Sequence, residues 1–310
     1  MHTRTRQKPL SWFDHIPSIP ELEERKRGRR VSVVLPALDE EATVAGVIAS
    51  IRPLLGGLVD ELLVIDSGST DRTVARARAA GATVFTREEA LPGIDPRPGK
   101  GEVLWRSLAV AAGELIVFVD ADLTDPGPQF VPSLLAPLLC DDDYALVKGF
   151  YRRPLGAGPD RDGGGRVTQL LARPLLTALA PGIADIVQPL GGEYAARREL
   201  LTSIPFAAGY GVEIGILLDC WQRYGPDAIA QVDLGVRVHR NRPTHELAVM
   251  SRQVAATLLD RLGIRDSGIG LTQYLPEGDG WRRVDSEVSL DDRPPMARLG
   301  VGPSCRGSGS

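Results

Sequence analysis

The chain has 310 residues, of which 43% are hydrophobic and 25% charged, and its formal net charge at pH 7 is −4. This length and composition suit one large globular domain with short extensions, and the mildly acidic balance argues against a protein that holds nucleic acid through a global positive field. No apolar run approaches the roughly 18 residues of a membrane span and no apolar region follows the charged amino terminus, so we expect neither a transmembrane segment nor a signal peptide.

Strand and helix patterns alternate through the first third of the chain. Residues 21–30 are highly charged and compatible with a short helix, but we favour a solvated lead-in. Beyond them, β-branched runs predict strands and periodic apolar residues predict helices. The predicted strands span 31–35, 61–65 and 83–85, and the predicted helices span 42–55 and 70–80. Residues 91–99 contain three prolines and two glycines, which is typical of a loop.

The alternation continues through the rest of the chain. Further strands are predicted at 115–122, 145–152, 192–196 and 228–240, and further helices at 100–112, 128–139, 166–179, 212–224 and 244–262. Thr244 is the expected cap of the last helix. Residues 156–165 hold five glycines and should be mobile, and from Gly263 the chain becomes polar, with its last dozen residues disordered. Helices alternating with strands at this spacing predict an α/β protein with a doubly wound parallel sheet.

The three cysteines, Cys140, Cys220 and Cys305, are scattered and form no CxxC pair. That distribution argues against a zinc site and against a disulfide framework. It fits a reducing compartment, so we expect a cytoplasmic protein.

The most informative stretch is an apolar run that ends in Asp120 and Asp122. Such a run is typical of a buried parallel strand, whose carboxyl end is where open α/β sheets place ligands. If the strand geometry persists, both carboxylates point the same way, and a cation such as Mg²⁺ relieves their repulsion. The alternative is that Asp122 or Asp125 caps a helix that begins near residues 126–128. We assign the cap to Asp125, and metal and ligand binding to Asp120 and Asp122.

Acidic segments follow three of the predicted strands, at residues 36–40, 66–69 and 120–122. The carboxyl ends of parallel strands share one edge of the sheet, so a ligand lying along that edge meets all three segments. Neither a dinucleotide-binding G-x-G-x-x-G motif nor a P-loop is present. A nucleotide bound here would therefore use carboxylates for its base and ribose, and a metal for its phosphates.

Polar residues near the end of the strand at 228–240 form a second candidate site. Alternation along a strand puts Arg237, His239 and Asn241 on one face, and Val236 and Val238 on the face toward the core. A lone histidine is more often structural than a ligand, but this one lies on the polar face of its strand.

Two helix starts carry polar groups with alternative explanations. A glycine run leads into a helix at Arg166, where backbone N–H groups and a guanidinium suit a phosphate, unless the run is only a flexible loop before an ordinary helix. Glu213 lies in the first turn of another helix. It either complements the helix dipole or contacts a reacting ligand as a positioning group or weak base.

Several motifs together resemble a known family. The segments that carry the resemblance are PALDEE, DSGSTD, KGE and VDAD, followed by VKGFYRRP, GGGRVT, QPLGGEYA, GYGVEIG and HRNRP. The first four resemble nucleotide-sugar glycosyltransferases of the GT-A fold. The others are similar to the glucosyl-3-phosphoglycerate synthases of actinobacteria, and the resemblance covers about residues 30–290.

The resemblance implies a Rossmann-like GT-A fold with a mostly parallel sheet flanked by helices. Residues 31–155 would bind the nucleotide sugar and 156–263 the acceptor, between extensions at 1–30 and 264–310. It also implies a retaining transfer of glucose from UDP-glucose to the 2-hydroxyl of 3-phosphoglycerate, with Mg²⁺ as cofactor. The family forms homodimers, and its product feeds methylglucose lipopolysaccharide synthesis in mycobacteria.

The resemblance also assigns roles to individual residues. The implied donor-binding residues are Pro36, Ala37, Leu38, Glu40, Asp66, Ser67, Lys100, Asp120 and Ala121, and the implied metal ligands are Asp122 and His239. The implied acceptor-binding residues are Gly165, Arg166, Thr168, Leu190, Gly191, Tyr210, Arg237 and Asn241. The histidine ligand hints that Mn²⁺ is tolerated. The side chain of Ala121 should point away, and Asp39 departs from the asparagine that related enzymes usually carry.

Glu213, Lys100 and Asp120 are the candidate catalytic residues. Retention is compatible with a covalent glycosyl-enzyme or with attack on the face from which UDP departs, and we favour same-face attack because no residue identifies itself as a nucleophile. Other readings are a transferase with GDP-mannose or another acceptor, a nucleotidyltransferase, and a non-catalytic nucleotide-sugar-binding protein.

Overall fold

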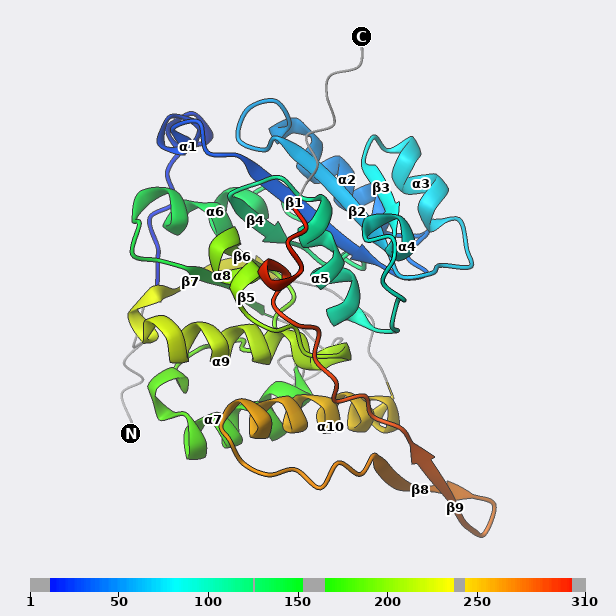
Figure 1. Ribbon diagram of the computed structural model, residues 1–310. Coiled ribbons are helices and arrows are strands. Elements are labelled where there is room, and N and C mark those ends of the chain that lie inside the picture. Colours follow the sequence, from blue (N-terminus) through cyan, green and yellow to red (C-terminus); the bar gives the residue numbers. More distant parts are fainter. Residues whose placement is uncertain (1–11, 125, 153–164, 237–242, 303–310) are drawn as a thin grey trace, which may run out of the picture.

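The computed structural model describes residues 12–124, 126–152, 165–236 and 243–302. A seven-stranded sheet runs through the molecule in the order β3-β2-β1-β4-β6-β5-β7 (Figure 1). Its strands are β1 (Val31–Ala37), β2 (Glu61–Asp66), β3 (Thr83–Thr86), β4 (Leu115–Phe118), β5 (Leu146–Arg152), β6 (Tyr194–Arg197) and β7 (Ile229–Val236). The alternating strands and helices predicted from the sequence are therefore confirmed.

Most neighbouring strands of the sheet are parallel. Parallel pairs join β1 to β2 and β4, β2 to β3, and β5 to β7, whereas β6 is antiparallel to both β4 and β5. From β1 the chain proceeds to β2 on one side and later returns to β4 on the other. Such a reversal of strand order opens a crevice at the carboxyl ends of the strands, where α/β sheets bind ligands.

Helices cover both faces of the sheet, so its central strands are buried on both sides. Adjacent residues in β1 divide between two core clusters: Val33 packs with α2 and α6, and Val34 packs with α5 and α9. The helices are α1 (Ile19–Lys26), α2 (Val44–Ile51), α3 (Thr73–Ala79), α4 (Arg87–Ala90), α5 (Lys100–Val110), α6 (Phe130–Cys140), α7 (Arg173–Leu179), α8 (Arg198–Ser203), α9 (Val212–Tyr224) and α10 (Thr244–Arg261). Within the described ranges, none of the helices has the length and apolar character that crossing a membrane requires.

The charged amino-terminal segment is a helix rather than a solvated lead-in. Helix α1 begins with a capping box, in which the backbone N–H of Ser18 donates to Glu21 over 2.8 Å. Leu22 is fully buried in the core, and Lys26 pairs with Asp60 at 2.8 Å. The preference for a solvated segment was wrong because one apolar residue among many charges is enough to dock a short helix.

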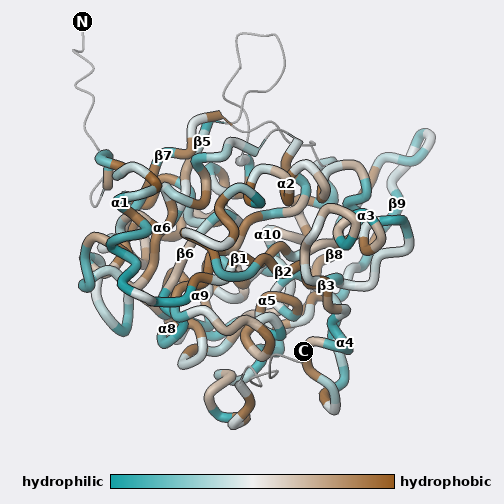
Figure 2. Tube along the Cα trace, turned by 90° about the horizontal axis from the view of Figure 1, so that it is seen from above, coloured by the Kyte–Doolittle hydropathy of each residue, from teal (hydrophilic) through white to brown (hydrophobic). Residues whose placement is uncertain are grey.

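The carboxyl-terminal region is more ordered than its composition suggests. It contains a hairpin of β8 (Leu271–Glu277) and β9 (Gly280–Ser286), which projects from the body in Figure 1 and has a hydrophilic tip in Figure 2. The chain then returns to the sheet domain, where Met296 is buried in the core. Of the dozen residues expected to be disordered, 303–310 lie outside the described residues.

Three predicted helices differ from the structure in their caps or first turns. Helix α10 has Pro243 at its N-cap, so Thr244 is its first residue rather than its cap. Helix α6 is capped at Gln129, so Asp122 is not a cap, and Asp125 lies outside the described residues. The helix predicted from Arg166 contains a π-helical turn at Thr168–Ala172 before α7 begins. The glycine-rich segment before it is described only at Gly165.

The prediction that Val236, at the end of β7, faces the core was wrong. Phe150 pairs with Asp233 but Arg152 pairs with Val236, so β7 has one extra residue here. This bulge ends the simple alternation of faces. Val236, which was expected to face the core, is 57% exposed. Arg237, His239 and Asn241 lie outside the described residues, so the prediction that they share a face stays a prediction.

Candidate functional site

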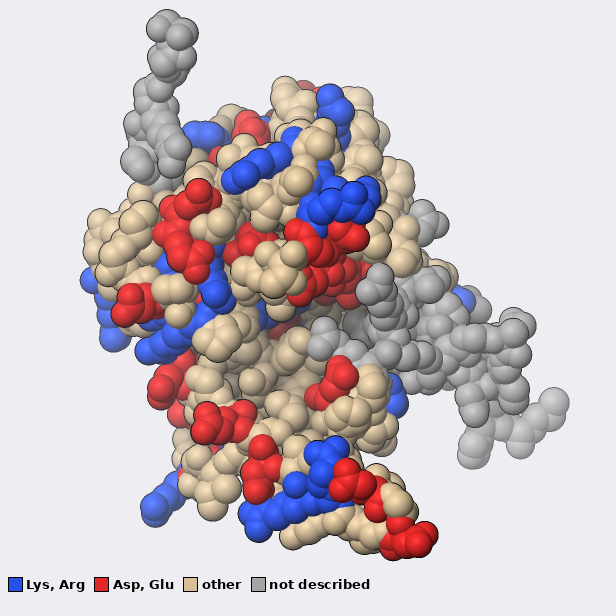
Figure 3. All heavy atoms as spheres, turned by 90° about the vertical axis from the view of Figure 1, so that its right-hand side faces the viewer, with Lys and Arg blue, Asp and Glu red and all other residues tan. Residues whose placement is uncertain are grey.

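A pocket of about 230 Å³ lies at the carboxyl ends of β1 and β2, beside the segment that follows β4. Its lining residues are Pro36, Ala37, Leu38, Glu40, Ser67, Gly99, Lys100, Val103, Asp120, Ala121, Asp122 and Tyr210. The predicted meeting of three strand ends is therefore confirmed. Figure 3 shows the side toward which these strands run, where acidic side chains gather above a hollow.

The loop after β1 is held in shape by Asp39. This residue has a φ of 54°, in the left-handed region that aspartate and asparagine tolerate better than most residues. Its carboxylate accepts from the backbone N–H of Thr70 over 2.8 Å, and its own N–H donates to Ser69 over 2.9 Å. An asparagine side chain would provide the same acceptor, so the departure from the family pattern keeps this contact between the two loops.

Asp66 shapes the loop after β2. It is buried, and its carboxylate accepts from the backbone N–H groups of Gly68 and Ser69 over 2.9 and 3.1 Å. These bonds form a side-chain-closed turn that presents Ser67 to the pocket. Asp66 itself is not one of the lining residues, and its predicted contact with the nucleotide stays a prediction.

Asp120 lies beyond the end of the regular strand. β4 ends at Phe118, although the N–H of Val119 still donates to β1 through Val34. The carboxylate of Asp120 lies so close to Gly192 that a Cβ at that glycine would collide with it. The glycine pair after Leu190 therefore lets the backbone before β6 approach the acidic motif.

Lys100, the first residue of α5, connects the acidic motif to α9. Its Nζ lies 2.5 Å from Oδ1 of Asp120 and 2.7 Å from Oε1 of Glu213. Burial disfavours the charge of Lys100, but Asp120 and Glu213 outweigh burial and raise the pKa of the ammonium well above its ordinary value. The three predicted catalytic residues thus form one largely buried, charged cluster in which Lys100, partly exposed like Asp120, lies between the two carboxylates.

Glu213 is in the first turn of α9 and is only 5% exposed. The short segment before it carries Tyr210, which lines the pocket, and this segment presses against the start of α5. A Cβ at Gly101 would collide with the carbonyl oxygen of Ala207. The glycine after Lys100 therefore allows the two elements of the charged cluster to meet.

Lys148 in β5 was not predicted as a site residue from the sequence. It is 2% exposed, donates from Nζ to the carbonyl oxygen of Gly191 over 2.6 Å, and lies 4.7 Å from the centre of the Tyr194 ring. Burial lowers the pKa of Lys148 to about 8, against the opposing field of Glu213. A lysine in an otherwise apolar buried strand was the available signal, since a buried charge requires specific partners.

Gly99 and Val103 also line the pocket without having been predicted. Val103 is three residues after Lys100, and residues at this spacing lie on one face of a helix. Helical geometry alone would therefore have placed Val103 beside the lysine.

The predicted acceptor residues do not gather in one place as the predicted donor residues do. Tyr210 lines the pocket, whereas Gly191 is not one of the lining residues and accepts a hydrogen bond from Nζ of Lys148. Arg166, however, donates to Oγ1 of Thr244 over 3.4 Å and lines a separate groove beside α10. Thr168 is buried in the π-helical turn. Leu190 is partly buried against the core, Gly165 is the first described residue before the π-helical turn, and Arg237 and Asn241 lie outside the described residues.

Asp122 offers oxygen ligands to a metal at the pocket. In the described part of the chain, no three His, Cys, Asp or Glu side chains gather to hold a metal ion. Mg²⁺ is usually held by one or two carboxylates together with substrate phosphates, so the partly exposed carboxylate of Asp122 fits this cation. The second predicted ligand, His239, lies in the range 237–242, outside the described residues.

Comparisons with known proteins identify the family. Residues 32–166 match the model of glycosyl transferase family 2. The glucosyl-3-phosphoglycerate synthase of Mycolicibacterium smegmatis is 63% identical over 291 residues, covering 93% of this chain and 96% of the relative.

Solved structures agree with this similarity. The glucosyl-3-phosphoglycerate synthase of Mycobacterium tuberculosis in complex with Mn²⁺, UDP-glucose and phosphoglyceric acid is 59% identical, with a TM-score of 0.86 over 93% of this chain and 98% of that chain. The same enzyme with Mg²⁺ and UDP gives 60% identity and a TM-score of 0.88, over 94% of this chain and 99% of that chain. The chain therefore has the GT-A fold, and it belongs to the glucosyl-3-phosphoglycerate synthase family of glycosyltransferases.

Proposed function

We propose that this protein transfers glucose from UDP-glucose to the 2-hydroxyl of 3-phospho-D-glycerate. The observation that carries the proposal is the pocket at the strand ends, where Asp122 lies with Lys100, which pairs with Asp120 and Glu213. The chain is also 63% identical to the synthase of M. smegmatis. The M. tuberculosis relative was crystallised with UDP-glucose and phosphoglyceric acid together.

The donor would lie along the strand ends, with its uridine against residues 36–40 and its diphosphate toward the start of α5. The pocket residues contributed by the end of β1 are apolar apart from Glu40, and Ser67, whose N–H donates to Ala37 over 2.8 Å, supplies a hydroxyl beside them. A Mg²⁺ or Mn²⁺ ion held by Asp122 and His239 would neutralise charge on the departing diphosphate. Asp66, Asp120 and Ala121 complete the proposed donor site.

Lys100 would act on the same developing charge from the protein side. Its ammonium is fixed between Asp120 and Glu213, so it needs no reorganisation when UDP departs. The amino terminus of α5, an 11-residue helix, adds a favourable dipole at the same position.

The acceptor would bind on the other side of the donor glucose. We assign its phosphate to Arg166, Thr168 and Asn241, with Gly165 and Arg237 nearby. Leu190 and Gly191 would lie under the sugar, with Tyr210 beside the acceptor. Lys148 supports the assignment of Gly191, because the hydrogen bond from its Nζ fixes the carbonyl oxygen of Gly191.

Retention would proceed by attack on the face from which UDP leaves. Asp120 and Glu213 are the carboxylates of the charged cluster, and each is already paired with Lys100 within 2.7 Å. A carboxylate engaged in this way is a weaker nucleophile, which favours an oxocarbenium-like path with a donor phosphate oxygen taking the acceptor proton. Detection of a glucosyl adduct on either residue by mass spectrometry would contradict this path.

We also propose that the protein is a cytoplasmic homodimer that supplies methylglucose lipopolysaccharide synthesis. The hairpin β8–β9 supports the dimer, because a two-stranded hairpin is marginal unless another surface packs against it. Tyr274 and Trp281 lie on one face of the hairpin and are 60% and 70% exposed. A second copy of the chain would cover them.

Product analysis tests the proposed reaction against its alternatives. The protein would be incubated with Mg²⁺, 3-phosphoglycerate and an equimolar mixture of UDP-glucose and GDP-mannose. We expect one α-linked glucosyl product by NMR, because UDP-glucose carries an α linkage and retention preserves it. A mannosyl product would indicate the other donor, a β linkage would contradict retention, and nucleotide binding without product would favour the non-catalytic alternative.

A further inference from the structure

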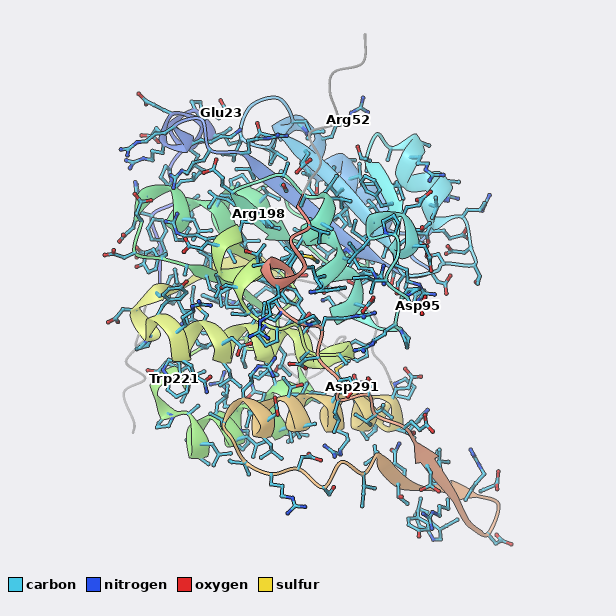
Figure 4. The ribbon with its side chains drawn as sticks, in the orientation of Figure 1. Glu23, Arg52, Asp95, Arg198, Trp221 and Asp291 are labelled. Carbon is cyan, nitrogen blue, oxygen red and sulfur yellow. The ribbon has the colours of Figure 1, made fainter. Side chains whose placement is uncertain are left out.

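The carboxyl-terminal segment packs directly against the elements that carry the charged cluster. After the hairpin, the backbone of Arg293 exchanges two hydrogen bonds with Phe206, of 2.8 and 3.0 Å. The indole N–H of Trp105 in α5 donates to the carbonyl oxygen of Pro294 over 2.8 Å. Figure 4 shows Asp291 on this segment where it passes α10, and Asp95 in the loop before α5.

The side chain of Arg293 is buried and has several hydrogen-bond partners. It is 9% exposed, and its guanidinium makes a bidentate pair with Glu102, at 2.7 Å from Nε and 2.9 Å from Nη2. Nη2 also donates to the carbonyl oxygen of Asp95 over 2.6 Å, and the group lies 5.0 Å from the centre of the Trp105 ring. A bidentate, buried pair of this kind fixes geometry more strictly than a surface ion pair does.

Two of the residues that Arg293 binds, Glu102 and Phe206, are close in sequence to members of the charged cluster. Glu102 is in the first turn of α5, two residues after Lys100. Phe206 begins the segment that passes Tyr210 and reaches Glu213. Arg293 therefore holds the start of α5 with its side chain and the approach to α9 with its backbone.

Asp292 adds a second connection. Its Oδ2 lies 2.6 Å from Nη2 of Arg261 in α10, and Nε of the same arginine lies 2.9 Å from Asp219 in α9. Asp292 is thus tied to the helix whose first turn contains Glu213. Two consecutive residues of the carboxyl-terminal segment are therefore connected to both elements that meet at the Lys100–Glu213 pair. Arg293 contacts α5 directly, and Asp292 is connected to α9 through Arg261.

We propose that Arg293 is a positioning residue for glucosyl transfer. Together with Asp292 it forms a clasp that sets the distance between Lys100 and Glu213, and so places the lysine against the leaving diphosphate. The predicted effect of Arg293 on turnover rests on the proposed function. A displacement of about 1 Å in a group that acts on the reacting centre is enough to lower a rate by about 100-fold, so a support of this kind affects rate more than binding.

The test compares Arg293→Gln with Arg293→Lys and with two controls. Arg298→Gln removes the same charge from an exposed position in the same segment, and Leu138→Ala destabilises the core on the opposite face of the sheet. We expect Arg293→Gln to lower kcat about 10-fold or more with little change in the KM for UDP-glucose, and Arg293→Lys to recover part of the loss. Both controls should keep the wild-type kcat per folded molecule. Asp292→Asn, at a partly exposed position, replaces Arg293→Gln if that variant does not fold.

A second readout does not depend on turnover. Amine-reactive labelling followed by peptide mass spectrometry measures the exposure of Lys100, which should react faster in Arg293→Gln than in the wild type or the controls. A wild-type kcat in Arg293→Gln, or an equal loss in Leu138→Ala, would overturn the positioning role. If the wild-type protein itself makes no glucosyl product, the proposed function fails, and the labelling rates still decide whether the clasp holds Lys100.

Discussion

The contact of Lys100 with two carboxylates is the feature of the site with the most direct chemical consequence. Replacing Lys100 by methionine keeps much of the side-chain volume but leaves Asp120 and Glu213 facing each other without a cation. We expect kcat/KM to fall by about 100-fold or more, because a preorganised positive charge at the leaving group is lost. Initial rates of UDP formation would measure the effect.

Lys26 offers a matched control for that substitution. It is also a mostly buried lysine paired with a carboxylate, at 2.8 Å from Asp60, but it lies on the opposite face of the sheet in α1. Lys26→Met should lose stability while keeping its activity per folded molecule. Equal losses of activity in the two variants would indicate that Lys100 acts only through the fold.

The lowered pKa of Lys148 predicts a specific dependence of stability on pH. Burial lowers this pKa from its ordinary value of 10.5 to about 8. Between these two values the unfolded chain binds more protons than the native protein, so this lysine makes the free energy of unfolding rise with pH. Urea denaturation at pH 8 to 10.5 should therefore show the wild type gaining stability relative to Lys148→Met. Parallel stability curves over this range would show that Lys148 titrates normally.

Among single residues, the sequence reveals the polar groups at strand ends but not their pairings. Asp120 and Asp122 were predicted because two carboxylates directly follow an apolar strand, whereas Lys100 was predicted from the resemblance to a known family. The contact between Lys100 and Glu213 was not predictable, since it joins helices more than a hundred residues apart. Lys148 was missed because an isolated lysine in a strand is normally placed on the solvent side.

Among the elements, the hairpin β8–β9 makes the clearest prediction. If a second copy covers its aromatic face, replacing Tyr274 and Trp281 together by serine should convert the dimer to a monomer in analytical ultracentrifugation. The control is Ile19→Ser, which removes an apolar side chain with 41% exposure from α1. An unchanged molar mass in the hairpin variant would place the dimer contact elsewhere.

The core elements were predictable because burial on both faces leaves long apolar runs, and α9 was placed at its observed bounds, Val212–Tyr224. Short, exposed elements such as the hairpin have a weaker hydrophobic pattern in the sequence. The hairpin does contain a turn signal, Gly278-Asp279, between its strands. The bulge in β7 has no comparable signal apart from Gly235, whose φ is 87°.

At the scale of the whole molecule, the topology accounts for the site. Residues from Pro36 to Asp122 converge because parallel strands end at one edge, and this convergence follows from the alternation of strands and helices alone. The contributions of α9 and of the carboxyl-terminal segment depend on how the second half folds back over α5. That packing involves apolar helix faces whose partners the sequence does not specify.

The most direct test of the account is acceptor-dependent release of UDP from UDP-glucose in the presence of Mg²⁺, in the wild type and in Asp122→Ala. The wild type should release UDP rapidly only when 3-phosphoglycerate is present, and the variant should lose this activity while remaining folded. Rapid release without the acceptor, or full activity in Asp122→Ala, would contradict the account of a metal-dependent glucosyltransferase whose pocket lies at the ends of β1, β2 and β4.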